Sequence, residues 1–198
     1  QRTKTNIRVY SDSLLIKALN IKLLLEQGCK ISTIAKKKDD EIFQLIEDIK
    51  SNTTKKNKEI YYVNKFIESA IYYDTNLFEK NYTEGLKQFN IIDFYQKIIL
   101  TTFSKIGIFW LTERINPGQE HFFSELIKQK IISHIDNDEY KITKNETWLL
   151  FLPPNEYHEI GLLFAKLILV SYGYPIIYLG ANLPLESLNS LSNKKQVD

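Results

Sequence analysis

Cysteine, methionine and long apolar runs are scarce or missing in this sequence of 198 residues. Its one cysteine, Cys29, excludes an internal disulfide framework and fits a reducing compartment. No stretch approaches the roughly 18 consecutive apolar residues that a membrane span requires, and no basic-then-apolar secretory leader opens the chain. From these absences we expect a cytoplasmic protein without a membrane partner.

Neither sign of charge dominates, since the sequence has 26 Lys and Arg residues against 24 Asp and Glu residues, for a net charge of +2. This balance is too even to mark the whole chain as nucleic-acid binding, so any such signal must be local. Hydrophobic residues make up 43% of the chain, which is enough for a sizeable core, and the length fits one or two domains. Aromatic residues reach 13% and supply flat, partly polar surfaces.

The local basic signal lies in the first ten residues, QRTKTNIRVY, which read as an extended hairpin or arm. Polar and basic side chains alternate along it: Arg2, Lys4, Asn6, Arg8 and Tyr10. Such residues contact phosphates and position a protein on double-stranded DNA without reading its sequence. A solvated arm with no DNA contact is the alternative.

Helical periodicity follows the arm. Three helices are predicted: residues 12–27, with Ser11 or Asp12 as a candidate cap and Gly28 at its end; residues 31–37, with Ser32 as a candidate cap; and a helix that starts near Asp39. The next segment, SNTTKKNK at 51–58, is polar and lacks periodicity, which favours a linker. The first predicted domain is therefore residues 1–52.

Residues 57–138 form the second predicted domain, because nearly all of residues 59–136 have the helical period. Helices are expected over 59–73, 75–88, 91–110 and from Pro117 onward, where proline suits a helix start. In the third of them, one apolar stripe is expected to hold Ile92, Tyr95, Ile99, Phe103, Ile106 and Trp110. Four helices with short connections predict an antiparallel four-helix bundle.

The period then changes over residues 146–198. Apolar runs at 147–152 and 174–179 alternate with helical stretches at 156–172 and 185–191. Strands that are apolar throughout predict a parallel sheet covered on both faces, and so a Rossmann-like α/β domain. Two strands bury such faces poorly, so we expect more strands and a truncated C-terminus. A truncated N-terminus is expected too, because the chain does not begin with Met.

A candidate site follows the first predicted strand, in the loop NEYHEIG. Ligands of open parallel sheets bind at the carboxyl ends of the strands, where His158 is placed. Glu156 could orient its ring, as carboxylates do for metal-ligating imidazoles, and Gly161 would let a flat ligand approach the backbone. The alternative is a helix-start histidine that bonds to its own loop.

A second candidate site lies in FWLTERINPGQEHF, residues 109–122, where Trp110 precedes the pair Glu120 and His121. Packing by the indole and support of a helix N-terminus by the carboxylate would explain these residues without a ligand. A lid over a flat cofactor would explain them together with the imidazole of His158. The two sites would then face each other across one broad ligand.

Three segments, in this order, resemble the MerR-type light-responsive transcriptional regulators of the CarH and LitR kind. The segments are RTKTNIRVYSDSLLIKALNIKLLLEQGCKISTIAK, which resembles a MerR wing and its following helices; W-x9-EH, from Trp110 to His121; and E-x-H-x-x-G, from Glu156 to Gly161. Arg8 and Tyr10 match an Arg-x-Tyr of the family's wing. The resemblance covers about residues 2–190, without the helix-turn-helix that precedes the wing in the family.

The resemblance implies a regulator and not an enzyme, most simply a repressor, controlled by adenosylcobalamin. His158 would be the lower axial ligand of cobalt, with Glu156 behind it, and Gly161 would pass close to the corrin ring. Partners would be double-stranded DNA and further copies of the chain, with a tetramer expected in the cofactor-bound form.

The upper face of the corrin would belong to the other motif. Trp110 would lie against the 5′-deoxyadenosyl group, and Glu120 and His121 would close around it. An adenosyl group favours an aromatic contact and a carboxylate that accepts hydrogen bonds from its hydroxyls or amine.

The sequence departs from the family at three points. Glu156 stands where Asp is usual. Leu111 stands where light-sensing members have a histidine that caps cobalt after photolysis, which leaves light sensing open, with His121 as a substitute ligand. The segments that hold the nucleotide tail of cobalamin are not in this sequence. Two further readings therefore stay open: a corrinoid carrier component of a methyltransferase, and a regulator that has lost cobalamin and answers to a protein partner.

Overall fold

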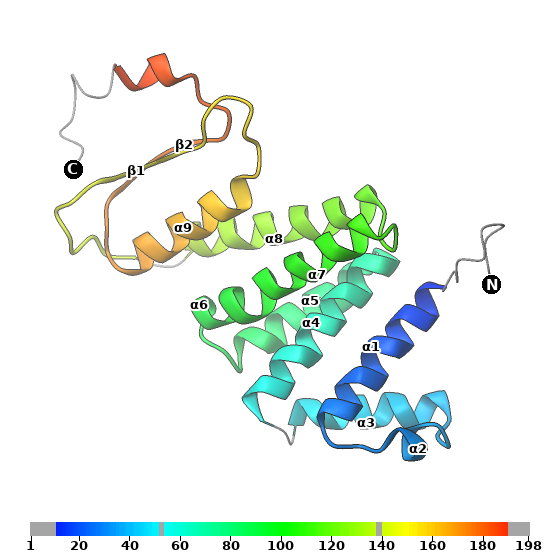
Figure 1. Ribbon diagram of the computed structural model, residues 1–198. Coiled ribbons are helices and arrows are strands. Elements are labelled where there is room, and N and C mark those ends of the chain that lie inside the picture. The colour runs from blue at the N-terminus through cyan, green and yellow to red at the C-terminus, as the bar shows by residue number, and fades with distance from the viewer. Residues whose placement is uncertain (1–10, 52–53, 138–139, 190–198) are drawn as a thin grey trace. The chain divides into compact units, whose positions relative to one another are not determined.

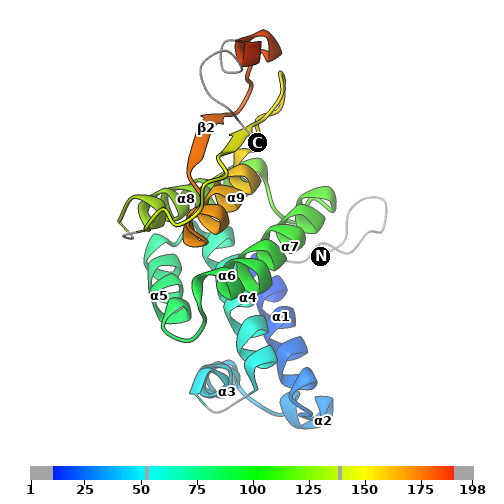
Figure 2. The same cartoon turned by 90° about the vertical axis from the view of Figure 1, so that its left-hand side faces the viewer.

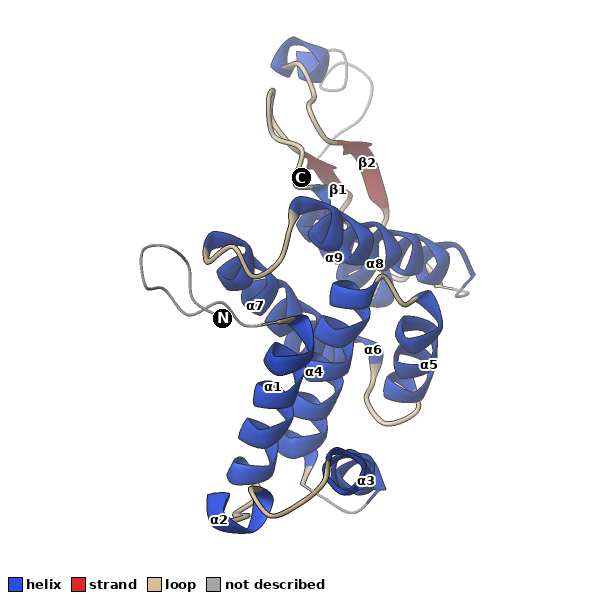
Figure 3. Cartoon of the chain, turned by 90° about the vertical axis from the view of Figure 1, so that its right-hand side faces the viewer, coloured by secondary structure: helices blue, strands red, loops and turns tan. Residues whose placement is uncertain are grey.

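A computed structural model describes residues 11–51, 54–137 and 140–189 of the chain. It is mostly helical, with one small parallel sheet (Figures 1 and 3). The predicted DNA-contacting residues Arg2, Lys4, Asn6, Arg8 and Tyr10 lie outside the described residues. Within the described part, no helix has both the length and the apolar character needed to cross a membrane.

The helices and strands follow one another along the chain in the order labelled in Figure 1. They are α1 (Asp12–Glu26), α2 (Ile31–Ile34), α3 (Asp39–Ser51), α4 (Lys55–Tyr72), α5 (Thr75–Leu86), α6 (Ile91–Phe94), the π-helical turn η1 (Tyr95–Ile99), α7 (Leu100–Leu111), α8 (Pro117–Asn137), β1 (Trp148–Phe151), α9 (Glu159–Ser171), β2 (Ile176–Gly180) and the 3-10 turn η2 (Leu185–Leu188). The chain divides between Phe123 and Ser124 into two compact units, which are described separately below.

Helix α1 begins and ends at the predicted residues. The Ser11 side chain accepts a hydrogen bond from the Leu14 amide at 3.4 Å, and Gly28 follows the helix with φ of +86°. The predicted cap of the next helix is wrong, because Ser32 lies inside α2 and Lys30 occupies the cap position. Helix α2 therefore begins without a side-chain cap, two residues earlier than a Ser32 cap would place it.

The polar segment predicted as a linker is partly helical. Helix α4 begins at Lys55, whose ammonium lies 3.0 Å from the Asp93 carboxylate and 5.5 Å from the centre of the Phe89 ring. These contacts link the first turn of α4 to Asp93 of α6 and to Phe89, although the sequence of this turn has no apolar period. Helices α1 and α3 both pack against α4 (Figures 1 and 2), so the first unit is continuous across this segment. The three-domain division into 1–52, 57–138 and 146–198 stays a prediction.

An aromatic cluster forms the core of the first unit. Phe123, from the start of α8, is fully buried and has its ring centre 5.0 Å from that of Phe103 on α7, 5.8 Å from Phe66 on α4 and 6.0 Å from Phe78 on α5. Two of these pairs, Phe123 with Phe78 and Phe123 with Phe103, are edge-to-face, an arrangement that stabilises a core beyond its buried area. The cluster joins four helices, as the predicted bundle requires.

The third predicted helix contains a π-helical turn, and this changes which residues are buried. The extra residue in the turn rotates the following helix, so the stripe does not keep one phase. The buried side chains are Phe94, Tyr95, Ile98, Ile99, Thr102 and Ile106. The predicted stripe holds at Tyr95, Ile99 and Ile106 but is wrong at its C-terminal end, where Trp110 lies in the last turn of α7 and is 52% exposed.

The second unit holds the parallel pair of strands that the apolar runs predicted. Trp148 pairs with Ile176 and Leu150 with Tyr178, and α9 packs against both strands. Leu167 of α9 is fully buried. Trp148 is 47% exposed, so the described residues leave part of the sheet uncovered, which differs from the prediction of two covered faces.

Candidate cofactor-binding residues in each unit

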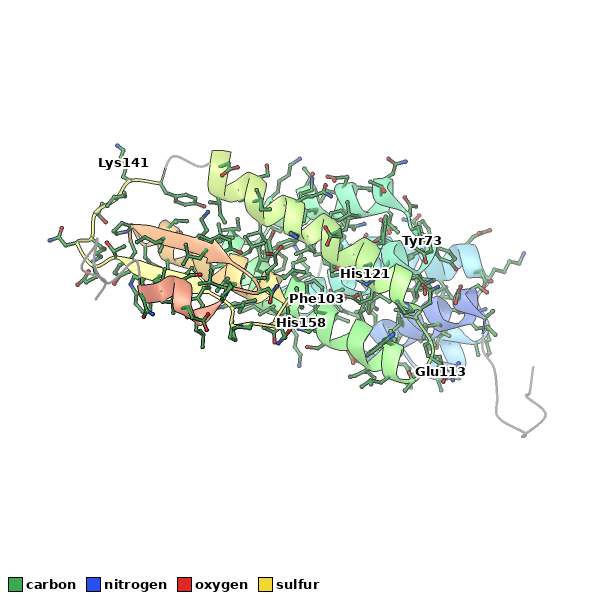
Figure 4. All side chains as sticks on the ribbon, turned by 90° about the horizontal axis from the view of Figure 1, so that it is seen from above. Tyr73, Phe103, Glu113, His121, Lys141 and His158 are labelled. Carbon is green, nitrogen blue, oxygen red and sulfur yellow. The ribbon has the colours of Figure 1, made fainter. Side chains whose placement is uncertain are left out.

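The loop after β1 pairs Glu156 with His158. The Glu156 carboxylate accepts a hydrogen bond from the His158 backbone amide at 2.8 Å, and the same oxygen lies 2.6 Å from Nδ1 of the His158 ring. The imidazole side chain is 94% exposed, and Figure 4 shows it on the loop ahead of α9. The predicted role of Glu156, orientation of this ring, thus has the required hydrogen-bond geometry.

This pairing determines which ring nitrogen of His158 can act outward. When Nδ1 carries the proton and donates it to Glu156, Nε2 keeps its lone pair and is available to a metal. The His158 backbone amide, followed by the His158 ring, stabilises the charged carboxylate and lowers the pKa of Glu156 below its ordinary value. A carboxylate that stays ionised is a good acceptor for the Nδ1 proton.

Gly161 lies in the first turn of α9, and the space beside it is open. A Cβ atom built at this position would meet no atom within 4 Å. Glycine inside a helix costs about 0.5–1 kcal/mol relative to alanine, and no crowding by the described residues demands it. The open space fits the predicted close approach of a flat ligand.

In the first unit, Trp110 borders a pocket of about 420 Å³ at the end of α7. The other lining residues are Asp12, Glu113, Arg114, Ile115, Asn116, Pro117 and Gln119. The half-exposed indole and two carboxylates give this pocket an aromatic wall and hydrogen-bond acceptors. Asp12 is the first residue of α1, so the helix that follows the predicted DNA arm also forms part of the wall.

Glu120 and His121 lie in the first turns of α8, next to the pocket lining in sequence. Glu120 is partly exposed and His121 is exposed, and Figure 4 shows His121 on α8 and Glu113 on the loop before it. Trp110, Glu120 and His121 therefore belong to one end of the first unit, whereas Glu156, His158 and Gly161 belong to the second. A single ligand contacted by both groups stays a prediction.

The turn between Trp110 and Glu120 is held in place by residues that are not among the predicted site residues. The Gln119 side chain accepts from the Asn116 amide at 2.8 Å, while the Asn116 side chain accepts from the Gln119 amide at 3.0 Å. The spacing of Asn116 and Gln119, three residues apart, is the sequence signal of this reciprocal capping box. Gln119 also donates to the Ile71 carbonyl at 2.8 Å, and Tyr73 bonds to Asn116 at 3.1 Å. These bonds fix the start of α8 against the end of α4.

We expect Gln119→Ala to lower the free energy of unfolding of the first unit by about 1–3 kcal/mol, because it strands a buried carbonyl and removes half of the capping box. Chemical denaturation followed by circular dichroism would measure this. Gln129→Ala is the matched control, since Gln129 is exposed on the same helix and surface changes usually stay within about 0.5 kcal/mol. Equal losses in the two variants would contradict the anchoring role.

Among the described residues, no group of three or more His, Cys, Asp or Glu side chains could hold a bare metal ion. Such a group is not required where a macrocycle supplies most ligands and the protein adds one axial nitrogen, as in haem proteins. The single outward-facing nitrogen of His158 matches that second kind of centre.

No family model matches the chain. The sequence is 23% identical over 196 residues to the HTH-type transcriptional repressor CarH of Myxococcus xanthus, a match that covers 95% of this chain and 63% of the repressor. The structure was also matched to the crystal structure of the methanol:cobalamin methyltransferase complex MtaBC from Methanosarcina barkeri. That match has a TM-score of 0.38 and 12% identity, and covers 95% of this chain and 67% of that chain. The chain is thus weakly similar, along nearly all its length, to a repressor of which it spans less than two thirds.

Proposed function

We propose that this chain belongs to a transcriptional regulator whose DNA binding is controlled by a corrinoid cofactor, adenosylcobalamin. The observation that carries the proposal is the Glu156–His158 pair at the carboxyl end of β1, with Nδ1 occupied by the carboxylate and Nε2 left for a metal. Weak similarity to a transcriptional repressor over nearly the whole chain supports the regulatory part.

The residues present fit the cofactor on three observations. The His158 ring is exposed and oriented, as an axial ligand must be. The open space beside Gly161 accommodates a flat macrocycle. Trp110 is half exposed beside a pocket with carboxylate acceptors, which suits an adenosyl group. When bound, the corrinoid supplies a cobalt centre with one face for a nitrogen ligand and the other for an alkyl group.

The control signal follows from the residue after Trp110. Leu111 is 76% exposed and carries no donor atom, so it cannot bind cobalt. We therefore propose that the regulator responds to binding of the cofactor, and that any light response would need another ligand such as His121. DNA contact through Arg2, Lys4, Asn6, Arg8 and Tyr10, and tetramer formation with the cofactor, are parts of the same proposal.

The test is the absorption spectrum of the protein with adenosylcobalamin in the dark. We expect a coloured complex whose spectrum reports an imidazole on cobalt, and His158→Ala should remove that signature. His134→Ala is the matched control, because His134 lies in the last turn of α8 and has no proposed ligand role. An unchanged spectrum in His158→Ala would overturn the ligand assignment.

A DNA-binding assay separates regulation from methyl-group carriage. The regulator predicts a cofactor-dependent shift of DNA mobility that weakens with salt, since phosphate contacts are salt-dependent. Methyl transfer to a partner protein without any DNA shift would instead favour a corrinoid carrier. Absence of cofactor uptake by the full-length gene product would favour a regulator that has lost cobalamin.

A further inference from the structure

Two loops at the carboxyl ends of β1 and β2 are joined through Asn182. The Asn182 side-chain oxygen accepts from the Asn155 amide at 2.9 Å, and the Asn182 amide donates to the Glu156 carbonyl at 3.1 Å. The next residue adds a third bond, from the Leu183 amide to the Leu152 carbonyl at 3.0 Å. One residue of the β2 loop thus holds the β1 loop on both sides of the Asn155–Glu156 peptide.

The backbone at both asparagines is adapted to this connection. Asn155 has φ of +66° and Asn182 has φ of +56°, values in the left-handed region that asparagine tolerates better than most residues. The Glu156 amide donates to the Pro153 carbonyl at 3.1 Å. Both backbone polar groups of Glu156 are therefore bonded, its carbonyl to Asn182 and its amide within its own loop.

The fixed backbone of Glu156 matters because the His158 ring has little else to orient it. A ring that is 94% exposed gains little from packing, so its orientation depends on the bond between Nδ1 and the Glu156 carboxylate. The carboxylate can hold that place only if its own backbone stays in register with the loop. Asn182 supplies that constraint from the loop after β2, more than twenty residues away along the chain.

We infer that Asn182 is a positioning residue for His158: it locks the β1 loop so that Glu156 holds the ring with Nε2 facing outward. The positioning role itself does not depend on the proposed function. Its purpose does, because the proposed function makes Nε2 the atom that binds cobalt. Nothing in the motif E-x-H-x-x-G itself points to Asn182, because the contact joins distant parts of the sequence.

The test compares Asn182→Gly with Asn182→Asp in the full chain. Glycine keeps the backbone amide and the positive φ but removes the acceptor, whereas aspartate keeps both the acceptor and the tolerance for this backbone. Long-range proton–nitrogen NMR of the neutral His158 ring reports which nitrogen carries the proton, with His158→Gln used for assignment. Amide hydrogen exchange at Asn155 reports directly on the hydrogen bond from the Asn155 amide to the Asn182 side chain.

We expect the wild-type ring to carry its proton on Nδ1. In Asn182→Gly the bond from the backbone amide of residue 182 to the Glu156 carbonyl remains, so the population of the Nε2–H form should rise above its wild-type level. The Asn155 amide should exchange about fivefold to tenfold faster, as expected from loss of one hydrogen bond. Asn182→Asp should restore the wild-type tautomer. Slow exchange at Leu150 in β1 should persist in both variants and shows that the strand pair is intact. A wild-type tautomer population in Asn182→Gly would overturn the inference, even if the Asn155 amide exchanged faster.

The two proposals fail differently. If Asn182→Gly changes the tautomer but the wild-type protein gives no imidazole-bound cobalt spectrum, the positioning role stands and the cobalamin function fails. If the cobalt spectrum appears and Asn182→Gly leaves tautomer and exchange unchanged, the function stands and the positioning role fails. A wild-type ring protonated mainly on Nε2 would overturn the positioning role, because the pairing that it maintains would be absent.

Discussion

Phe123→Ala is expected to lower the free energy of unfolding of the first unit by about 3–5 kcal/mol, the usual cost of truncating a buried aromatic ring. Phe123 is fully buried and its ring contacts those of Phe66, Phe78 and Phe103. Removing it leaves a cavity where four helices meet, and the surrounding rings relax only partly into it. Denaturation followed by far-ultraviolet circular dichroism measures the change.

Phe122→Ala is the matched control for this variant. Phe122 precedes Phe123 on the same helix, is only partly buried, and has its ring centre 5.6 Å from that of Tyr73. The same truncation there should cost about a third as much, because less apolar surface returns to water. A Phe123 variant no less stable than the Phe122 variant would show that the aromatic cluster does not form the core of this unit.

The stability of this core also affects how cofactor binding is to be interpreted. Helix α8 carries the core residue Phe123 directly after Glu120 and His121, so the proposed cofactor contacts and the core share two turns of one helix. A loss of cofactor affinity in Phe123→Ala would therefore be expected as a secondary effect of unfolding. Variants of Glu120 and His121 should be judged against the stability of the first unit for the same reason.

Sequence patterns predicted the elements whose signals are local. Ser11 caps α1, Pro117 starts α8, and the two apolar runs after residue 146 form parallel strands. Each of these depends on side chains within a few residues of one another, or on the apolar character of a short run. Such information is complete in the local sequence.

The π-helical turn at Tyr95–Ile99 and the exposure of Trp110 were not predictable in this way. A helical stripe drawn at constant period placed Trp110 with the buried Ile106, but Trp110 lies in the last turn of α7, where its indole is half exposed. The difference bears on function, because an exposed Trp110 can contact a ligand and a buried one cannot. Here the local pattern failed at a residue with a proposed role.

The candidate site was only partly predictable, because some of its contacts are local and others join distant segments. The interaction between Glu156 and His158 spans two residues, so spacing alone indicated it. The bonds made by Asn182 and by Gln119 to Ile71 join segments 27 and 48 residues apart. No local pattern reports which loops or helix ends the fold brings together, so the residues that position the site were found only in the structure.

Gly161→Leu is expected to weaken adenosylcobalamin binding by roughly tenfold to a hundredfold, the effect of an overpacking cost of about 1–3 kcal/mol in a filled site. Gly161 is exposed and a Cβ at this position meets no atom within 4 Å, so the new side chain can extend into solvent in the free protein and should not lower its stability. Leucine also favours the helix more than glycine by roughly 0.5–1 kcal/mol. The free variant should therefore unfold at a higher denaturant concentration while it binds the cofactor less well.

Gly107→Leu is the control for a variant that gains stability and loses affinity. Gly107 also lies in a helix with open space at its Cβ position, but it is not one of the proposed cofactor contacts. It should gain stability similarly and keep its affinity for adenosylcobalamin, measured by titration of the absorption change in the dark. Unchanged affinity in Gly161→Leu would mean that this face of α9 does not meet the corrin ring. Neither crowding nor ligand binding would then explain why a glycine occupies this helical position. The proposal that the cofactor lies over α9 would have to be abandoned.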